Sequence, residues 1–388
     1  MENFFGEEIE KVVFISKEQL ENTWERNLYG RYFPDTCIFN VYPDELSKSG
    51  QFLCDVKPEG SCADETGLSA VAGQEGLCFY YDKKKIETEV YGLYQSIFSR
   101  NEGILETDVM TKKKAVILGC GSVGSLVAME LARSGVGYFL LADADILEYH
   151  NLCRHQCGLE DVGDLKVNAL ERKLKNINPK VRVEKFAGIV QNLPKKTLDE
   201  FCVPGDTVFV GCADNRDADV YTNRISIYYS SYFVSIGFWE RAYAGEIFYH
   251  IPGRNMPCYG CALGDGGDIS ARAQANHHVY SNQELTEGMK FEPGISVDIN
   301  FITTIGIKLI IDILNLTNEE YVPRLLGSLT QYTIACNTCD PKIGGEMVEI
   351  FSYPLQVTTS LMVGFGKKCA EYSCCEHERK KREEDAQK

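Results

Sequence analysis

The sequence has little positive charge for its size. Its 388 residues include 40 lysines and arginines against 56 aspartates and glutamates, a formal net charge of −16. A protein that holds nucleic acid by neutralising phosphates needs a stripe of basic side chains. No such stripe is present, which argues against a nucleic-acid partner. A free nucleotide remains possible, because backbone N–H groups at the start of a helix can bind its phosphates.

Long hydrophobic runs are also missing. The most apolar helix candidate, residues 299–314, is interrupted by Lys308 and Asp312 and is shorter than the roughly 20 residues that cross a bilayer. The first eight residues lack the basic region and the apolar core of a secretory signal. No internal repeat or low-complexity block stands out. We therefore expect a cytoplasmic protein with no membrane partner.

Cysteine, by contrast, is abundant, with 16 residues. In a reducing compartment these are expected to be metal ligands or core residues before disulfides. The chain is long enough for two or three domains. We expect a small α+β domain in residues 1–95, a nucleotide-binding domain in residues 96–366 and a solvated tail of mixed charge in residues 367–388.

The clearest local pattern is a strand, a turn, a helix and a second strand. An apolar run at residues 115–118 leads into G-C-G-S-V-G at residues 119–124, and an apolar helix pattern then ends at Gly135. A second apolar run, residues 138–141, ends on Asp143. This is the opening of a nucleotide-binding βαβ unit.

Strand and helix patterns continue to alternate beyond this unit, which predicts an α/β domain with a mainly parallel sheet covered on both faces. The expected strands are residues 181–186, 207–211, 232–237 and 246–250, and the expected helices are residues 166–176, 216–229 and 299–314. Before the unit we expect a helix and connector in residues 87–110, and near the C-terminus a strand-like segment in residues 346–357.

The polar residues after the glycine turn indicate which type of reaction the nucleotide site supports. Asp143 lies about 20 residues beyond the turn, where an acid can bind a ribose, so that a dehydrogenase is still possible. Arg154 and Lys166 follow, and Asp214 comes after a later strand. Two cations can stabilise charge on phosphate oxygens, and a carboxylate can hold magnesium. Hydride transfer does not require two cations and a magnesium-binding carboxylate, whereas phosphoryl or nucleotidyl transfer uses them.

In residues 97 to about 345 the sequence resembles the ThiF, MoeB and ubiquitin-activating-enzyme superfamily of adenylating enzymes. The resemblance rests on five motifs in order: G-x-G-x-x-G (Gly119, Gly121, Gly124), D-x-D (Asp143, Asp145), N-L-x-R (Asn151, Arg154), G-x-x-K (Gly163, Lys166), and Asp214 with Asn215. One departure is His155, which follows Arg154 where glutamine is frequent.

This resemblance implies that ATP and Mg²⁺ bind and that a substrate carboxylate attacks the α-phosphate. Asp143 would then bind the ribose, and Asp214, paired with Asn215, would hold the magnesium. The phosphates would be contacted by Asn151, Arg154 and Lys166. Members of the superfamily are usually homodimers in which an arginine reaches the partner's ATP, and Arg100 is the candidate for that role.

Two C-x-x-C pairs, Cys258 with Cys261 and Cys336 with Cys339, fit a structural zinc site with four thiolate ligands. The resemblance also implies a thioester-forming cysteine in the loop that follows the first pair. That loop, residues 264–297, contains no cysteine, although it contains His277 and His278. A transfer thiol would have to come from elsewhere, for example from Cys374 or Cys375.

With no cysteine in this loop and with a long N-terminal extension, the chain resembles the adenylating enzymes that mature ribosomal peptides of the microcin C and pantocin type. This implies that residues 1–95 clamp a precursor peptide, and their short strands could pair with an extended chain. Two other hypotheses stay open. The chain could activate a ubiquitin-like or sulfur-carrier protein, or it could be a nucleotide-binding scaffold without catalysis.

Overall fold

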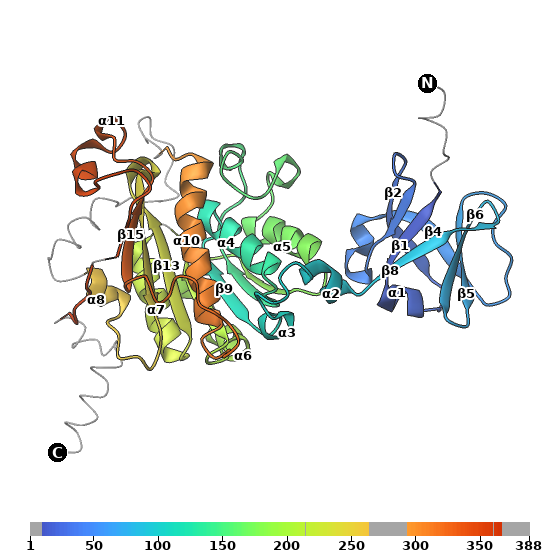
Figure 1. Cartoon of the computed structure of the whole chain (residues 1–388), viewed down its shortest axis with the longest axis horizontal. Helices are drawn as coiled ribbons and strands as arrows, with labels where there is room; N and C mark the ends of the chain where they lie inside the picture. The colour runs from blue at the N-terminus through green and yellow to red at the C-terminus, as the bar shows by residue number, and fades with distance from the viewer. Residues whose placement is uncertain (1–9, 214, 264–292, 360, 367–388) are drawn as a thin grey trace, which may run out of the picture. The chain divides into compact units, whose positions relative to one another are not determined.

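The computed structural model describes residues 10–213, 215–263, 293–359 and 361–366 (Figure 1). The chain forms two compact units. One comprises the residues up to 102 together with 175–180, and the other comprises residues 103–174 and those from 181 onward. The glycine turn and the polar motifs that follow it belong to the second unit, whereas Arg100 belongs to the first.

The first unit consists of short strands with little helix. Its elements are β1 (Val12–Ser16), α1 (Lys17–Glu21), β2 (Asn27–Phe33), β3 (Ile38–Val41), the 3-10 helix η1 (Asp44–Ser49), β4 (Gln51–Lys57), β5 (Leu68–Gly73), β6 (Gly76–Tyr81), β7 (Lys84–Lys85), β8 (Glu87–Tyr91) and α2 (Leu93–Phe98). The sheet order is β7-β6-β5-β4-β2-β3-β1-β8.

This sheet closes on itself into a small barrel. The two strands at its ends, β7 and β8, are consecutive in the chain, with only Ile86 between them. The Ile86 N–H donates to the Phe79 carbonyl of β6, and β8 then pairs in parallel with β1. One continuous stretch of chain therefore joins both ends of the sheet. Alternate side chains such as Val13, Leu28 and Phe79 fill the interior.

The second unit contains the expected βαβ order. Its main elements are α3 (Thr107–Met110), β9 (Lys114–Leu118), α4 (Ser122–Arg133), β10 (Tyr138–Ala142), α5 (Lys166–Ile177), β11 (Arg182–Phe186), α6 (Lys195–Phe201), β12 (Thr207–Gly211), α7 (Arg216–Tyr228), β13 (Tyr232–Phe238), β14 (Ala244–His250), α8 (Tyr259–Leu263), α10 (Ser296–Leu314), β15 (Tyr332–Cys336), α11 (Pro341–Gly344) and β16 (Val357–Thr358). Short 3-10 helices are η2 (Tyr149–Asn151), η3 (Leu159–Asp161), η4 (Val190–Asn192), η5 (Glu240–Ala242) and η6 (Gly345–Ile350).

The strand order of its sheet is β11-β10-β9-β12-β13-β14-β15-β16. The first five strands are parallel, and β14, β15 and β16 add antiparallel pairings. The parallel part has the order 3-2-1-4-5 in chain sequence, which reverses direction between β9 and β12. A nucleotide binds beyond the carboxyl ends of the strands at such a switch point.

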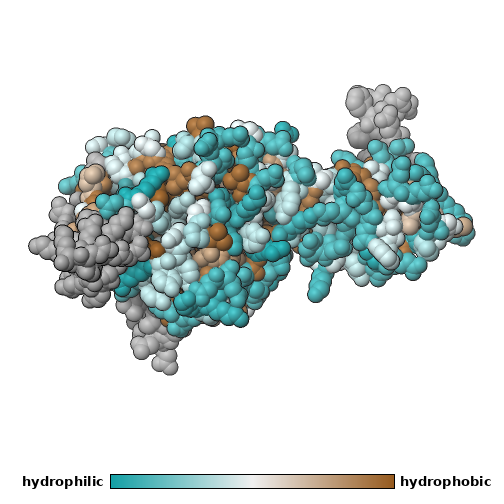
Figure 2. Space-filling model, turned by 90° about the horizontal axis from the view of Figure 1, so that it is seen from below, coloured by the Kyte–Doolittle hydropathy of each residue, from teal (hydrophilic) through white to brown (hydrophobic). Residues whose placement is uncertain are grey.

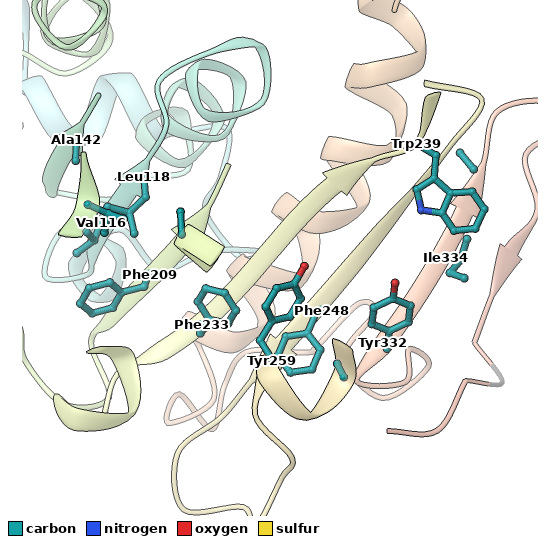
Figure 3. Close-up of a cluster of buried hydrophobic side chains, with 14 of the residues drawn as sticks. Val116, Leu118, Ala142, Phe209, Phe233, Trp239, Phe248, Tyr259, Tyr332 and Ile334 are labelled. Atoms are coloured by element: carbon teal, nitrogen blue, oxygen red, sulfur yellow. The ribbon is translucent and has the colours of Figure 1, made fainter. Parts of the chain in front are cut away.

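Helices cover both faces of this sheet. On one face, α4 and α10 pack together, and Gly306 of α10 lies against Ile236 of β13 (Figure 1). On the other face, α7 and α8 cover a core rich in aromatic side chains. Figure 3 shows Phe233, Phe248 and Tyr259 of this core gathered close together, and the Phe248 and Tyr259 ring centroids are 5.1 Å apart. The space-filling view shows a mostly hydrophilic surface with scattered apolar residues (Figure 2).

Two local expectations were wrong. Residues 87–110 do not begin with a helix, because β8 occupies Glu87–Tyr91 and only the short helices α2 and α3 follow. Residues 346–357 form mainly η6 and a loop, with strand only at Val357–Thr358. Among the described residues, no helix is long and apolar enough to cross a membrane.

Candidate nucleotide site

The glycine turn lies between the ends of β9 and β12. Gly119 has φ +91°, and a Cβ there would lie 2.8 Å from the Cα of Ala213, just after β12. A Cβ on Gly124 would lie 1.8 Å from the Gly119 carbonyl oxygen. Gly121 differs, because no atom lies within 4 Å of the position of its Cβ. Two glycines therefore allow close packing, and the third borders open space in front of the turn.

Asp143 connects the end of β10 to this turn. One carboxylate oxygen, Oδ2, accepts the Cys120 N–H at 2.6 Å, and the other, Oδ1, accepts the Asp145 N–H at 2.8 Å. The first bond arises because β10 pairs in parallel with β9, which brings their carboxyl ends to the same edge of the sheet, whereas the second is a local contact two residues along the chain. The acid expected to bind the ribose is thus held beside the glycine turn.

Lys166 is the first residue of α5 and reaches the same edge. Its Nζ lies 2.8 Å from Oδ2 of Asp145, and its backbone N–H donates to the Asp145 carbonyl at 3.0 Å. The lysine side chain is 11% exposed, whereas that of Asp145 is 63% exposed. A mostly buried ammonium is therefore fixed by the second acid of the D-x-D motif.

Arg154 lies in a segment that is hydrogen-bonded to the start of α4. The Ser122 hydroxyl donates to the Arg154 carbonyl at 2.9 Å, and the Gln156 N–H donates to the Ser125 hydroxyl at 3.3 Å. The guanidinium lies near Gly294, since a Cβ on that glycine would be 3.8 Å from Arg154 Nη1. The Arg154 backbone is thus attached to the helix that follows the glycine turn.

His155 follows Arg154 and is hydrogen-bonded directly to the glycine turn. Its Nε2 lies 2.7 Å from the Cys120 carbonyl oxygen, and its Nδ1 accepts the Cys157 N–H at 3.0 Å. This pair of contacts requires a neutral ring with the proton on Nε2. Burial lowers the pKa of His155, and this effect outweighs the hydrogen bond to the Cys120 carbonyl, which raises it. The sequence marked this position only as a departure from the usual motif.

The other residues predicted to contact the nucleotide are Asn151, Asn215, Asp214 and Arg100. The Asn151 Oδ1 accepts the Glu148 N–H at 3.0 Å, and the Asn215 Oδ1 accepts the Ala218 N–H at 3.1 Å and so caps α7. Asp214 lies outside the described residues, although its neighbour Ala213 is in contact with Gly119. Arg100 is exposed in the first unit.

Two cysteines beside the turn are poor nucleophiles. Cys120 lies within the glycine turn and Cys212 follows β12. Burial raises the pKa of both thiols well above the ordinary value, and the nearby Asp143 carboxylate adds to the effect at Cys120. Thiols that stay protonated do not attack an acyl group readily. His277, His278, Cys374 and Cys375 lie outside the described residues.

The structure does not show the predicted four-cysteine zinc site, which stays a prediction. In the described parts of the chain, no cluster of three or more metal-binding side chains is present. The register of β14 and β15 explains why. Cys336 pairs with Ala244, whereas Tyr332 pairs with Phe248, against which Tyr259 packs beside Cys258. Four residues of strand, about 14 Å, separate those two positions.

Thiolates on one zinc ion are at most about 4.6 Å apart, which is less than the distance between these two strand positions. Figure 3 shows Tyr259 close to Phe248, and Ile334 of β15 on the side toward Trp239. Cys336 instead ends β15, where its N–H donates to the Gln356 carbonyl. The spacing of the cysteines in the sequence gave no sign of this antiparallel pairing.

A parallel sheet of order 3-2-1-4-5 with a glycine turn at its switch point defines a doubly wound nucleotide-binding domain. The chain belongs to the ThiF family, whose profile matches residues 95–340. The ubiquitin-like modifier-activating enzyme 5 of Gallus gallus is 35% identical over 165 residues, or 38% of each chain. That of Mus musculus is 30% identical over 212 residues, or 49% of this chain and 50% of the relative.

The chain thus spans half or less of the length of these curated relatives. Similar solved structures include E. coli MccB with ATP, at a TM-score of 0.48 and 20% identity, covering 71% of this chain and 70% of that one. PaaA has a TM-score of 0.45 and 17% identity, covering 66% of this chain and 75% of that one.

Proposed function

We propose that this chain is an ATP- and Mg²⁺-dependent enzyme that adenylates a carboxylate of a ribosomal precursor peptide. The observation that carries the proposal is the mostly buried Lys166 ammonium, which Asp145 holds close to Asp143 and the open glycine turn. The Arg154 segment is bonded to the start of α4 through its backbone carbonyl, which accepts the Ser122 hydroxyl. Fixed cations of this kind stabilise charge that develops on phosphate oxygens during nucleotidyl transfer.

In the proposed step, a carboxylate oxygen of the substrate attacks the α-phosphorus of ATP. The bond from the α-phosphorus to its bridging oxygen breaks, and pyrophosphate leaves with that electron pair. The product is an acyl adenylate. Asp143 holds the ribose, Arg154 and Lys166 bind the phosphates, and Asp214 is the residue that would hold magnesium. The ion, when bound, neutralises part of the phosphate charge.

We propose a peptide substrate and no enzyme thioester because of the positions and pKa values of the cysteines. The loop in residues 264–297 contains none, and the pKa values of the two thiols beside the turn are raised. Neither of these two thiols is therefore suited to take the acyl group from a mixed anhydride formed here. A nucleophile within the peptide itself could then attack the anhydride or the peptide could retain AMP.

The N-terminal domain is the proposed peptide-binding element. Because its sheet closes through Ile86, strand addition at an open edge is not favoured. Its outer surface instead exposes Trp24 and Phe52, at 81% and 55%, and Phe52 meets the Tyr29 ring edge-on. We propose that these aromatic side chains contact the peptide and that the active enzyme is a homodimer in which Arg100 reaches the partner's ATP.

The proposal is tested with the full chain, ATP, Mg²⁺ and a synthetic copy of a short peptide encoded beside its gene. Pyrophosphate release and hydroxylamine trapping of the acyl adenylate, detected as a peptide hydroxamate by mass spectrometry, are expected. Lys166→Ala should lower the rate by about 10²–10³, or ~3 kcal/mol. The control Lys196→Ala, whose side chain is 86% exposed on α6, should leave it unchanged. Equal rates for both variants would refute the assigned role.

The 30–35% identity to ubiquitin-like modifier-activating enzymes favours a second candidate, activation of a small carrier protein. A reducible thioester between this chain and a carrier, seen on a non-reducing gel, would establish it and exclude the first. A scaffold without catalysis would show ATP binding that Asp214→Ala does not change, together with no pyrophosphate release.

A further inference from the structure

Glu246 of β14 is a buried carboxylate with partners on three different elements. Its side chain is 4% exposed, and its Oε1 lies 2.7 Å from Nη1 of Arg216, at the start of α7. Its Oε2 accepts the Trp239 Nε1–H at 3.1 Å and the hydroxyl of Tyr332 on β15. Trp239 and Tyr332 belong to the aromatic core of Figure 3. One carboxylate therefore joins the start of α7, the turn after β13 and the strand β15.

The Arg216 end of this network adjoins the glycine turn. Arg216 is the first residue of α7 and comes three residues after Ala213. The backbone of Ala213 packs against the turn, since a Cβ on Gly119 would lie 2.8 Å from the Ala213 Cα. The ion pair with Glu246 therefore fixes the helix end of a short segment whose strand end touches the glycine turn.

The Trp239 end of the network holds the turn between β13 and β14. This turn contains two consecutive non-glycine residues in the left-handed region, Arg241 at φ +53° and Ala242 at φ +52°. Such residues are strained and persist only where their surroundings fix them. Here the Trp239 N–H donates to the Ala244 carbonyl at 2.9 Å, and Asn337 Nδ2 donates to the Ala242 carbonyl at 2.7 Å. Because β12 and β13 are parallel, this turn lies at the same edge of the sheet as the segment before α7.

The turn between β13 and β14 also lies near Arg154. A Cβ on Gly294 would be 3.5 Å from the Ala242 Cβ and 3.8 Å from Arg154 Nη1. Glu246 thus holds two segments at the nucleotide edge of the sheet. One of them touches the glycine turn, and the other lies near the Arg154 guanidinium.

We propose that Glu246 is a positioning residue for the nucleotide site, acting through Arg216 on the segment between β12 and α7 and through Trp239 on the turn between β13 and β14. A buried ion pair seldom stabilises a fold more than apolar side chains of similar size would, so its main effect here is on the geometry of these segments. The inference rests on the proposed function in one respect, that the site binds ATP. It does not depend on which carboxylate is adenylated.

The test is the ATP affinity of the full chain without peptide, measured by calorimetry, in the double variant Arg216→Met with Glu246→Gln. This variant removes both charges and keeps an oxygen acceptor for Trp239 and Tyr332. We expect an unchanged melting temperature and an ATP affinity at least about tenfold weaker, because misplacing functional groups by about 1 Å can cost as much as ~10²-fold. Arg216→Lys, which keeps a cation for the single carboxylate oxygen, should retain the affinity.

The matched control removes another ion pair with a buried cation, Lys113 with Asp206, at the opposite edge of the sheet. Lys113→Met with Asp206→Asn should leave ATP affinity unchanged. An unaltered affinity in the double variant at Arg216 and Glu246, an equal loss in the control, or a loss of the same size in Arg216→Lys would each overturn the proposal.

Pyrophosphate release, measured in parallel, separates this inference from the proposed adenylation. If the unaltered chain binds ATP with an affinity that depends on the Arg216–Glu246 pair but releases no pyrophosphate, adenylation is refuted and the positioning role stands. If it releases pyrophosphate and the double variant does so with the same rate and ATP affinity, adenylation stands and the positioning role is refuted.

Discussion

His155 gives a prediction that separates the acid stability of this protein from that of a simple variant. The ring is 7% exposed and makes two hydrogen bonds, to the Cys120 carbonyl and from the Cys157 N–H. His155→Ala leaves both buried backbone groups without their partner. Each such group costs about 1–3 kcal/mol, so we expect the free energy of unfolding to fall by roughly 2–6 kcal/mol. The variant His155→Gln, which keeps an amide donor and acceptor, should lose less.

The pH dependence follows from the lowered pKa of His155. At pH values above about 6.5, the histidine is neutral in both the folded and the unfolded chain. As the pH falls below that value, His155 binds a proton in the unfolded chain but not yet in the folded chain. Stability is therefore present above pH 6.5 and is lost on acidification, by at most about 1.4 kcal/mol per pH unit from this residue.

The assay is urea denaturation from pH 7.5 to pH 5, followed by fluorescence, for the unaltered chain and for His155→Gln. The difference between the two curves isolates His155 from the other histidines. We expect the unaltered chain to lose more stability than the glutamine variant over this range. Parallel curves would refute the neutral, buried histidine as the link between the arginine segment and the turn.

The other predictions concern the turn, the ribose acid and one buried carboxylate. Gly121→Ala should leave the melting temperature unchanged, because its Cβ meets no atom within 4 Å, yet weaken ATP binding in calorimetry by at least tenfold, about 1.4 kcal/mol. Gly124→Ala should instead destabilise the fold by at least about 2 kcal/mol, because its Cβ would lie 1.8 Å from a carbonyl oxygen; equal behaviour of the two variants would contradict this division. Asp143→Asn should lower ATP affinity, since an amide cannot accept both the Cys120 and Asp145 N–H groups. Asp312→Ala should cost at least about 3 kcal/mol in denaturant unfolding, because this fully buried carboxylate accepts the Tyr321 hydroxyl and three backbone N–H groups; a cost below 1 kcal/mol would refute it.

The sequence by itself determined the local elements of the nucleotide-binding unit. Residues 207–211 form β12 as expected, and the glycine turn, the Asp143 position and the helix from Lys166 follow from short-range patterns. These features are local because backbone conformation and burial periodicity are set by neighbouring residues. Even Asp312, which interrupts the apolar run of α10, was visible as an exception, although its buried hydrogen bonds were not.

Only the tertiary structure decided which distant segments meet. The register of β14 and β15 separates the two cysteine pairs, the Ile86 hydrogen bond closes the barrel, and His155 reaches the Cys120 carbonyl. Spacing along a chain does not encode the direction or register of strand pairing, because these depend on how whole faces are buried together. The same motifs that predicted a nucleotide site could therefore not specify what holds it in place.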